Sequence, residues 1–343
     1  MTGDRWLGIE DPYRVFRMKP LWSFAAVAAL ALTPAGAQAA PADSATSRTS
    51  ATPAATTAKP AAKPAPASAK SPAGSGAAAA TPDVSGYQEL LNELLTVISA
   101  PGEPLDTRFD YEKFYDMRGR FERCKRIRRQ MLAVPPSAMD ERTRLAWAIN
   151  TYNYLVIETA TEYLLVPERG RLRYMGPRDI KTPMGPFFQA PLVEIEGKKY
   201  SLDQFELHFL FADFERAKGG PPPASLDPRV HFALVCGAIG CPPLQPRAYR
   251  ADSLKIQLES ATRNALAMPR HLVFLEASGR VQASSIFQWY SRDFGGMEKA
   301  FDFVLKYAPA KTRAAIEQRK IKSISGMTVW DWNLNQTVRK KEI

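Results

Sequence analysis

A histidine and two cysteines lie within eleven positions of the stretch HFALVCGAIGCPPL, residues 231–244. A thiolate beside an imidazole is what nucleophilic cysteine chemistry needs, because the imidazole takes or holds the proton. The two glycines between Cys236 and Cys241 let the chain turn, and Pro242-Pro243 then fixes a rigid exit. The stretch therefore suits a thiol site, a short disulfide loop or packed core.

The geometry expected for this stretch favours one of the two cysteines as a nucleophile. The apolar run RVHFALV, residues 229–235, predicts a buried strand. Side chains alternate along a strand, so His231 and Cys236 would point to opposite faces. Cys241 follows the turn and can return toward the imidazole. We therefore predict Cys241 as nucleophile and His231 as base, within hydrogen-bond reach or one water beyond it.

The same spacing also permits a disulfide between Cys236 and Cys241. Cysteine in an exported protein is usually oxidised, so a disulfide or plain packing is favoured over a free catalytic thiol. Such a short loop gains little entropic stabilisation, so the bond would mainly fix its shape. If Cys241 is bonded to Cys236, a binding module becomes the better interpretation than an enzyme.

Two asparagines occupy an otherwise apolar helix pattern. Asn150 and Asn153 lie three positions apart and share a face with Trp147. A buried amide without partners costs about 1 to 3 kcal/mol, so both must be satisfied. Either they hold the main chain of a loop, or they serve a site, with Asn150 orienting His231 and Asn153 and Trp147 contacting a ligand.

Further candidate site residues come from an acidic side chain and from aromatic motifs. Glu206 is flanked by aromatic and aliphatic residues, which favours a raised pKa or a pairing with an arginine such as Arg229. It is also an alternative orienter for His231. The motifs FQWY, with Trp289 and Tyr290, and WDWNLN suit a sugar or peptide groove, although aromatic core is commoner.

The first 39 residues have the order of a secretory signal. Basic residues precede the apolar run LWSFAAVAALAL, and the small-residue triplet Ala37-Gln38-Ala39 suits cleavage before Ala40. The run is shorter than the roughly 20 residues that span a bilayer, so we predict no stable span after cleavage. Met18 starts a more typical signal than Met1. The expected location is periplasmic or secreted.

Residues 40–83 are rich in Ala, Pro, Ser, Thr and Lys and cannot bury a core, which predicts a disordered tether. Residues 84–343 are enough for one globular α+β domain of helices packed on a small sheet. We expect a hairpin around Glu196-Gly197 and a capping box at Ser201 that opens a helix. The other elements expected are helices at 86–99, 110–133, 140–164, 252–266, 286–291, 296–306 and 310–318, with a hairpin at 272–283.

The formal charge of +11 is concentrated in RGRFERCKRIRRQ, residues 118–130. A solvated helix face is favoured over a patch for an anionic cell-envelope polymer or peptide. No nucleic-acid-binding signature is present, so no nucleic-acid partner is expected. The three histidines lack the spacing of metal ligands, so no metal site is expected. The sequence has no nucleotide-binding fingerprint, so no cofactor is expected.

Five motifs in order carry a family resemblance: WAINTYNYLVI, YSLDQFELHFL, DPRVHFALVCGAIGCPPLQPRAY, IFQWYSRDF and VWDWNLN. Over roughly residues 105–337 the chain resembles the domain of unknown function 547. One departure is that Glu206-Leu207 stands where an adjacent Glu-His pair is expected. The resemblance names a family without supplying a mechanism.

Two function hypotheses follow. The first is an exported cysteine-dependent hydrolase or acyl-transfer enzyme acting on an amide or ester, with Cys241, His231 and either Asn150 or Glu206. The second is a non-catalytic envelope module that binds a peptide, glycan or protein partner through the same cleft. A free thiol at Cys241 favours the first, and a Cys236–Cys241 bond favours the second.

Overall fold

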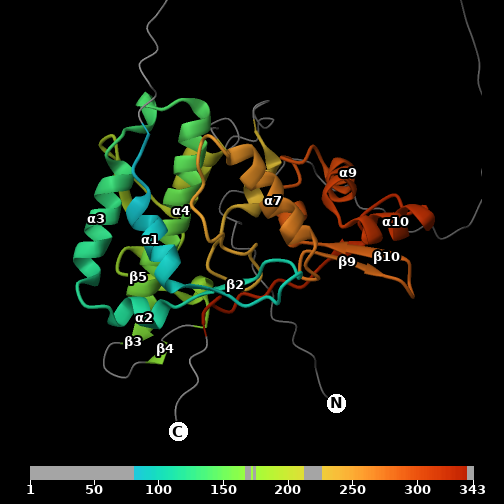
Figure 1. Cartoon of the computed structure of the whole chain (residues 1–343), viewed down its shortest axis with the longest axis horizontal. Coiled ribbons are helices and arrows are strands. Elements are labelled where there is room, and N and C mark those ends of the chain that lie inside the picture. The colour runs from blue at the N-terminus through green and yellow to red at the C-terminus, as the bar shows by residue number, and fades with distance from the viewer. Residues whose placement is uncertain (1–80, 167–170, 173–174, 212–225, 338–343) are drawn as a thin grey trace, which may run out of the picture. The chain divides into compact units, whose positions relative to one another are not determined.

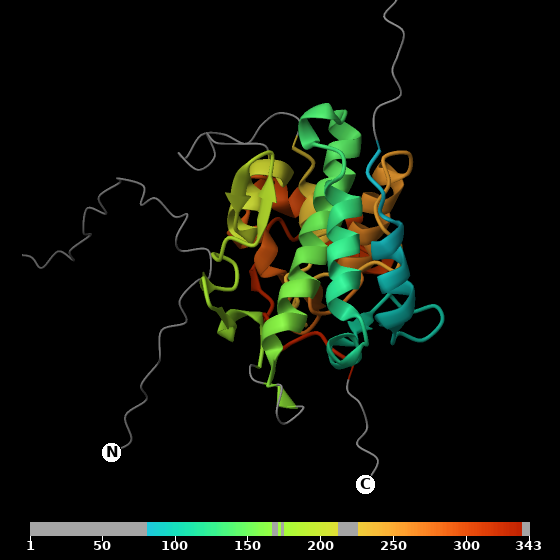
Figure 2. The ribbon, with the colours of Figure 1, turned by 90° about the vertical axis from the view of Figure 1, so that its left-hand side faces the viewer.

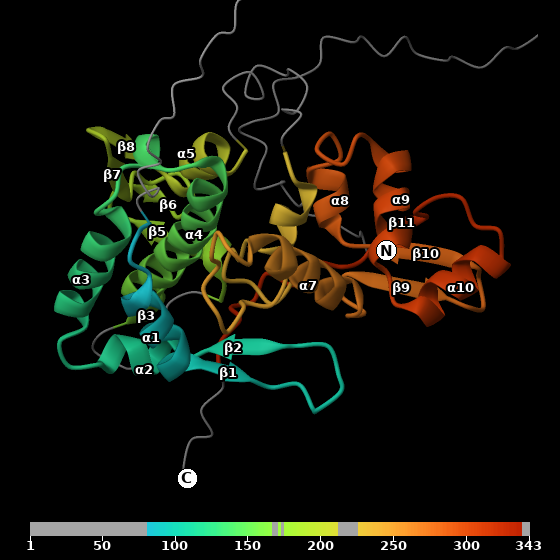
Figure 3. The same ribbon diagram turned by 45° about the horizontal axis from the view of Figure 1, so that its top comes forward.

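The computed structural model describes residues 81–166, 171–172, 175–211 and 226–337. The predicted signal at 1–39 and nearly all of the predicted tether lie outside the described residues. Within them, helices combine with sheets of two or three strands, so the fold is α+β as expected. Helices α1, α3 and α4 lie on one side, β9, β10, α9 and α10 on the other, and α7 between them (Figure 1 and Figure 3).

Four helices build the N-terminal side, and Figure 2 shows α3 and α4 running side by side. They bury apolar faces that include Leu90, Ile127 and Ile149, each fully inaccessible to solvent. Trp147 is also buried, and its Nε1 donates to the Met131 carbonyl at 2.7 Å. Their bounds are α1 (Ser85–Leu94), α2 (Tyr111–Asp116), α3 (Arg120–Leu132) and α4 (Glu141–Leu164).

Short antiparallel pairs connect these helices. The hairpin β7 (Val193–Ile195) and β8 (Lys198–Tyr200) turns at Glu196 and Gly197, both with positive φ, as the sequence predicts. The capping box of Ser201 and Gln204 is also present and opens α5 (Leu202–Phe205). The other pairs are β1 (Leu95–Val97) with β2 (Thr107–Phe109), β3 (Leu165–Val166) with β4 (Arg171–Leu172), and β5 (Lys181–Thr182) with β6 (Gly185–Pro186).

The C-terminal side has its own apolar cluster, centred on Phe232, Phe287 and Val304. A larger cluster holds the N-terminal helices, and Tyr290 and Trp330 pack against both. The elements here are α7 (Leu254–Leu266), β9 (Leu272–Leu275), β10 (Arg280–Ala283), α8 (Ser285–Trp289), α9 (Met297–Tyr307), α10 (Ala310–Gln318) and β11 (Gly326–Met327). Strand β10 pairs antiparallel with β9 and parallel with β11.

The predicted strand at 229–235 is wrong. Pro228–Phe232 forms a 3₁₀ helix, which the Asp227 side chain caps by accepting from the Arg229 amide. Asp-Pro favours this start, because the short polar side chain caps the turn and the proline ring fixes the first φ. The alternation that separated His231 from Cys236 therefore does not apply.

Residues 330–337, which we name the C-terminal strap, run beside the loop that carries the cysteines. The Ile239 amide donates to the main-chain carbonyl of Asn333, and the Gly240 amide donates to that of Asp331, each at 2.8 Å. In return, the Asn335 amide donates to the Gly237 carbonyl at 2.8 Å. The strap therefore supplies hydrogen-bond partners that a neighbouring strand would otherwise provide.

The strap also runs against Gly176, where the Leu334 amide donates to the carbonyl of the preceding Met175 at 2.9 Å. A Cβ atom at Gly176 would overlap the main-chain carbonyl of Trp332. Gly176→Ala should therefore displace the strap and lower the free energy of unfolding by about 1 to 3 kcal/mol, the usual range for overpacking.

Urea denaturation measures this loss. Gly326→Ala is the matched control, since its Cβ would meet atoms no closer than 3.7 Å. Equal stability of the two variants would contradict the close approach of the strap to Gly176.

Candidate functional site

Six of the predicted site residues meet at one small cavity between the two apolar clusters. Its volume is about 30 Å³, enough for a water molecule. The six are His231, Glu206, Trp289, Tyr290 and both cysteines. Trp330, from the motif WDWNLN, also lines it, and so do four residues that sequence reasoning did not single out: Tyr152, Leu234, Pro242 and Ile286.

Cys236 and Cys241 are bonded to each other, with their Cα atoms 6.4 Å apart. Of the two alternatives for this pair, the structure has the disulfide. A sulfur in a disulfide is not a thiolate, so Cys241 is not a nucleophile in this oxidation state. The Cys236 amide nevertheless donates to the Cys241 sulfur at 3.1 Å, which fixes the position of that sulfur.

The imidazole of His231 contacts a carboxylate that sequence reasoning missed. His231 Nε2 lies 2.8 Å from Asp293 Oδ2, and the two side chains are 1% and 0% exposed. The ring also packs against Phe211 and Tyr290, at centroid distances of 4.8 and 4.0 Å. Its orientation is therefore fixed by these ring contacts and by the carboxylate at one edge. Asp293 lies in the motif IFQWYSRDF, but no spacing rule connects it to His231.

Glu206 lies at the first turn of a π-helix, Glu206–Leu210, that continues α5. Single turns of π-helix are frequent at functional sites. The Tyr290 hydroxyl donates to Glu206 Oε1 at 2.8 Å. One turn earlier, burial and the charge of Glu206 raise the pKa of Asp203 to about 8. The Asp203 carboxyl, one turn before Glu206, is therefore protonated more easily than a solvated aspartate.

Asn150 and Asn153 hold loop main chain, which is the first of the two alternatives stated for them. Asn153 donates to the Ala233 carbonyl and accepts from the Val235 amide, both at 2.9 Å. Asn150 makes the same paired contact with Tyr249, both bonds at 2.8 Å. Neither lines the cavity, and Trp147 is core. Asn153 therefore acts on the site by positioning the loop between His231 and Cys236.

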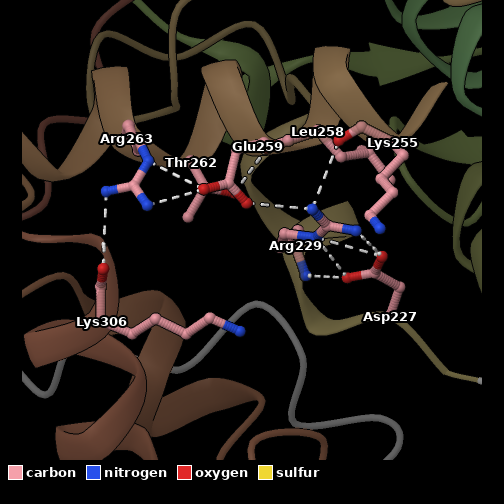
Figure 4. A network of polar contacts seen from close by, with 8 residues as sticks. All are labelled: Asp227, Arg229, Lys255, Leu258, Glu259, Thr262, Arg263 and Lys306. Carbon is pink, nitrogen blue, oxygen red and sulfur yellow. Dashed lines mark hydrogen bonds and ion pairs between the residues drawn. The ribbon is translucent and has the colours of Figure 1, made fainter. Parts of the chain in front are cut away.

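Arg229 does not meet Glu206, contrary to our expectation, because it has closer partners. Its guanidinium contacts Asp227 at 2.6 Å and Glu259 at 3.2 Å (Figure 4). Glu259 in turn pairs with Arg263, and the Arg263 guanidinium lies 3.5 Å from the Lys306 carbonyl (Figure 4). Arg229 thus links the 3₁₀ helix to α7, outside the cavity that holds His231.

The basic residues of α3 are largely matched by carboxylates, four from neighbouring helices and one from α3 itself. Arg128 makes a two-pronged contact with Glu158, at 3.0 and 2.8 Å. The other pairs are Arg120–Glu162, Arg123–Glu93, Arg126–Glu89 and Lys125–Glu122. These contacts weaken the case for a patch that binds an anion. Cys124, on the same helix, is buried, and burial raises the pKa of its thiol.

Two further features of the described residues concern membrane spans and metal sites. No helix in the ranges that the structure describes is long and apolar enough to cross a bilayer. Those same ranges hold no group of three or more His, Cys, Asp or Glu side chains placed to bind a metal ion.

Fold and site together define an α+β domain with a disulfide-closed cavity between two apolar clusters. Residues 136–265 match the family model described as "Protein of unknown function, DUF547". The family resemblance predicted from the motifs is confirmed over these residues. The match includes Glu206, His231 and both cysteines, whereas Asp293 and the strap lie beyond it. Comparisons with curated proteins and with solved structures find no match.

Asn153→Ala should destabilise the domain, because the Ala233 carbonyl and the Val235 amide would lose their partner while remaining buried. Each unsatisfied group costs about 1 to 3 kcal/mol, so we expect a loss of at least about 2 kcal/mol. Urea denaturation measures it.

Asn92→Ala serves as the control, since Asn92 is exposed on α1. A loss no larger than that of the control would show that Asn153 does not hold the loop.

Proposed function

We propose that this chain is an exported envelope module that binds a peptide segment of a partner on the surface beside the cavity. The observation that carries the proposal is a group of three tryptophans at this site, Trp289, Trp330 and Trp332, which we name the tryptophan cluster. Two of them line the cavity. The cluster joins the motifs FQWY and WDWNLN, the two that suggested a groove from sequence.

The tryptophan cluster is tightly grouped and partly open to solvent. Ring centroids lie 4.7 Å apart for Trp289 and Trp330, 6.0 Å for Trp289 and Trp332, and 5.8 Å for Trp330 and Trp332. All three side chains are half-buried. The Arg178 guanidinium lies 4.7 Å from the Trp332 ring centroid. Trp, Tyr and Arg are the residue types that dominate binding energy at protein interfaces.

Polar groups at the cavity suit a peptide main chain. The indole Nε1 of Trp330 is buried and has no hydrogen-bond partner among the described residues. A buried donor without an acceptor costs about 1 to 3 kcal/mol, which a ligand carbonyl would recover. The site therefore places an indole donor beside flat apolar rings.

The disulfide supports binding as well. It closes the loop Cys236–Cys241, which Asn153 holds on one side and the strap on the other. A preformed surface binds more tightly, because less conformational freedom is lost on association. The rigid loop and the bonded sulfurs together favour binding over catalysis in the oxidised protein.

Trp289→Ala should weaken peptide binding by about 10-fold or more, as truncation of a central aromatic contact usually does. The probe is a synthetic peptide enriched from a phage-displayed random heptapeptide library on the wild-type protein, and fluorescence anisotropy measures its affinity.

Phe121→Ala, which removes another exposed aromatic ring on α3, should leave the affinity unchanged. Failure to enrich any peptide, or affinities that Trp289→Ala does not lower, would reject the proposal. Binding of chitooligosaccharides in place of peptides would reassign the cluster to glycans.

Export is the second part of the proposal, and it rests on the order of basic, apolar and small residues before Ala40. We expect the mature protein to begin near Ala40 and to lie outside the inner membrane. N-terminal sequencing of the protein from a periplasmic or secreted fraction tests this, and full-length protein confined to the cytosol would contradict it.

A further inference from the structure

We propose that reduction of the Cys236–Cys241 bond turns the cavity into a thiol site for acyl transfer. Cys241 attacks an amide or ester carbonyl, His231 carries the proton, and Asp293 positions His231. The proposal uses the cavity of the proposed peptide site, but its test uses small reagents and does not depend on peptide binding.

The first observation is that the sulfurs and the imidazole share one water-sized space. His231, Cys236 and Cys241 all line the cavity of about 30 Å³. A base acts on a proton within hydrogen-bond reach or through a single water, and a cavity of this size allows either. The thiol and the base therefore face the same small space.

The second observation is the burial of the histidine–carboxylate pair. Burying an ionised carboxylate costs several kcal/mol unless a positive group compensates it. The Asp293 side chain is fully buried, and its Oδ2 lies 2.8 Å from His231 Nε2. With a proton on Nε2, the other ring nitrogen, Nδ1, is an acceptor, and taking a second proton makes the ring the positive partner of Asp293. The pair thus suits a histidine that accepts a proton from a thiol.

The third observation distinguishes the two sulfurs. The Cys236 amide donates to the Cys241 sulfur at 3.1 Å, and Gly237, at φ 90°, holds the turn that follows. A hydrogen bond to the charged form of a group lowers its pKa. In the reduced protein this donor would stabilise a thiolate on Cys241. Cys236 is then the partner that re-forms the disulfide.

The fourth observation is that the loop does not need the bond to keep its shape. Asn153 holds the chain before Cys236, and the strap holds Gly237, Ile239 and Gly240 through main-chain hydrogen bonds. A disulfide that closes so short a loop also adds little entropic stabilisation. Reduction should therefore free Cys241 without unfolding the site.

The acyl transfer begins with reduction of the disulfide. A dithiol reductant gives two electrons and two protons to the disulfide and becomes a disulfide itself. Cys241 passes its proton to His231 and attacks the carbonyl carbon, so a carbon–sulfur bond forms while the bond to the leaving amine or alcohol breaks. The leaving group takes the proton from His231. Water then attacks the thioester, its proton goes through His231 to the sulfur, and a carboxylic acid is released.

The experiment measures the rate at which iodoacetamide labels Cys241, with each labelled cysteine mapped by mass spectrometry. Wild-type protein should show no label at Cys241 until a dithiol is added. Cys236→Ser should be labelled without reductant, with a pH midpoint below the ordinary cysteine value of about 8.5. p-Nitrophenyl acetate should acetylate Cys241 both in the reduced wild-type protein and in the Cys236→Ser variant. Cys124, whose thiol pKa is raised by burial, is the internal control and should be labelled more slowly than Cys241.

His231→Asn and Asp293→Asn, each added to Cys236→Ser, should slow labelling at neutral pH by about 10-fold or more and move the midpoint toward 8.5. Reduced wild-type protein gives the same readout if the variant with Cys236→Ser does not fold. A midpoint at 8.5 that His231→Asn does not change, or no acetylation of Cys241, overturns the proposal. Iodoacetamide and p-nitrophenyl acetate report thiol reactivity in the absence of any peptide, so loss of peptide binding and loss of thiol reactivity are separate results.

Discussion

The site depends on a buried segment that has no sheet to satisfy its main chain. Residues 233–241 are almost entirely inaccessible, yet they form neither strand nor regular helix. Buried amides and carbonyls without partners are expensive, so the hydrogen bonds must come from elsewhere. Asn153 supplies them at one end and the C-terminal strap at the other. Every other feature of the cavity follows from the path that these bonds impose.

That path brings distant parts of the chain to one point. The segment leaves His231 in contact with Asp293, places Cys241 beside Cys236, and rests between two apolar clusters. Tyr290 and Trp330 pack on both clusters, so the polar groups are enclosed without being part of either core. Sites at such a junction combine rigid walls with access from one side. Binding in the oxidised form and thiol chemistry in the reduced form would use the same walls.

The sequence predicted the local elements well and the long-range contacts poorly. The hairpin at Glu196-Gly197 and the capping box at Ser201 were predictable because turn and cap chemistry acts over a few residues. The prediction of a strand at 229–235 was wrong, because an apolar run indicates that a segment is buried but not which groups satisfy its main-chain hydrogen bonds. The pairing of His231 with Asp293 has no fixed spacing, so only the fold reveals it. Spacing also allowed the disulfide and the free thiol equally.

The strap has a consequence for the order in which the protein assembles. Its residues come after all of the helices described, so during synthesis they are the last part of the site to emerge. Both cysteines are therefore made, and able to meet an oxidant, before the segment that covers their loop. The Trp330 ring then packs against Gly240, so closely that a Cβ atom at that position would overlap the ring. The oxidation state of the sulfurs can thus be set before the strap is made, and the strap then covers the loop that carries them.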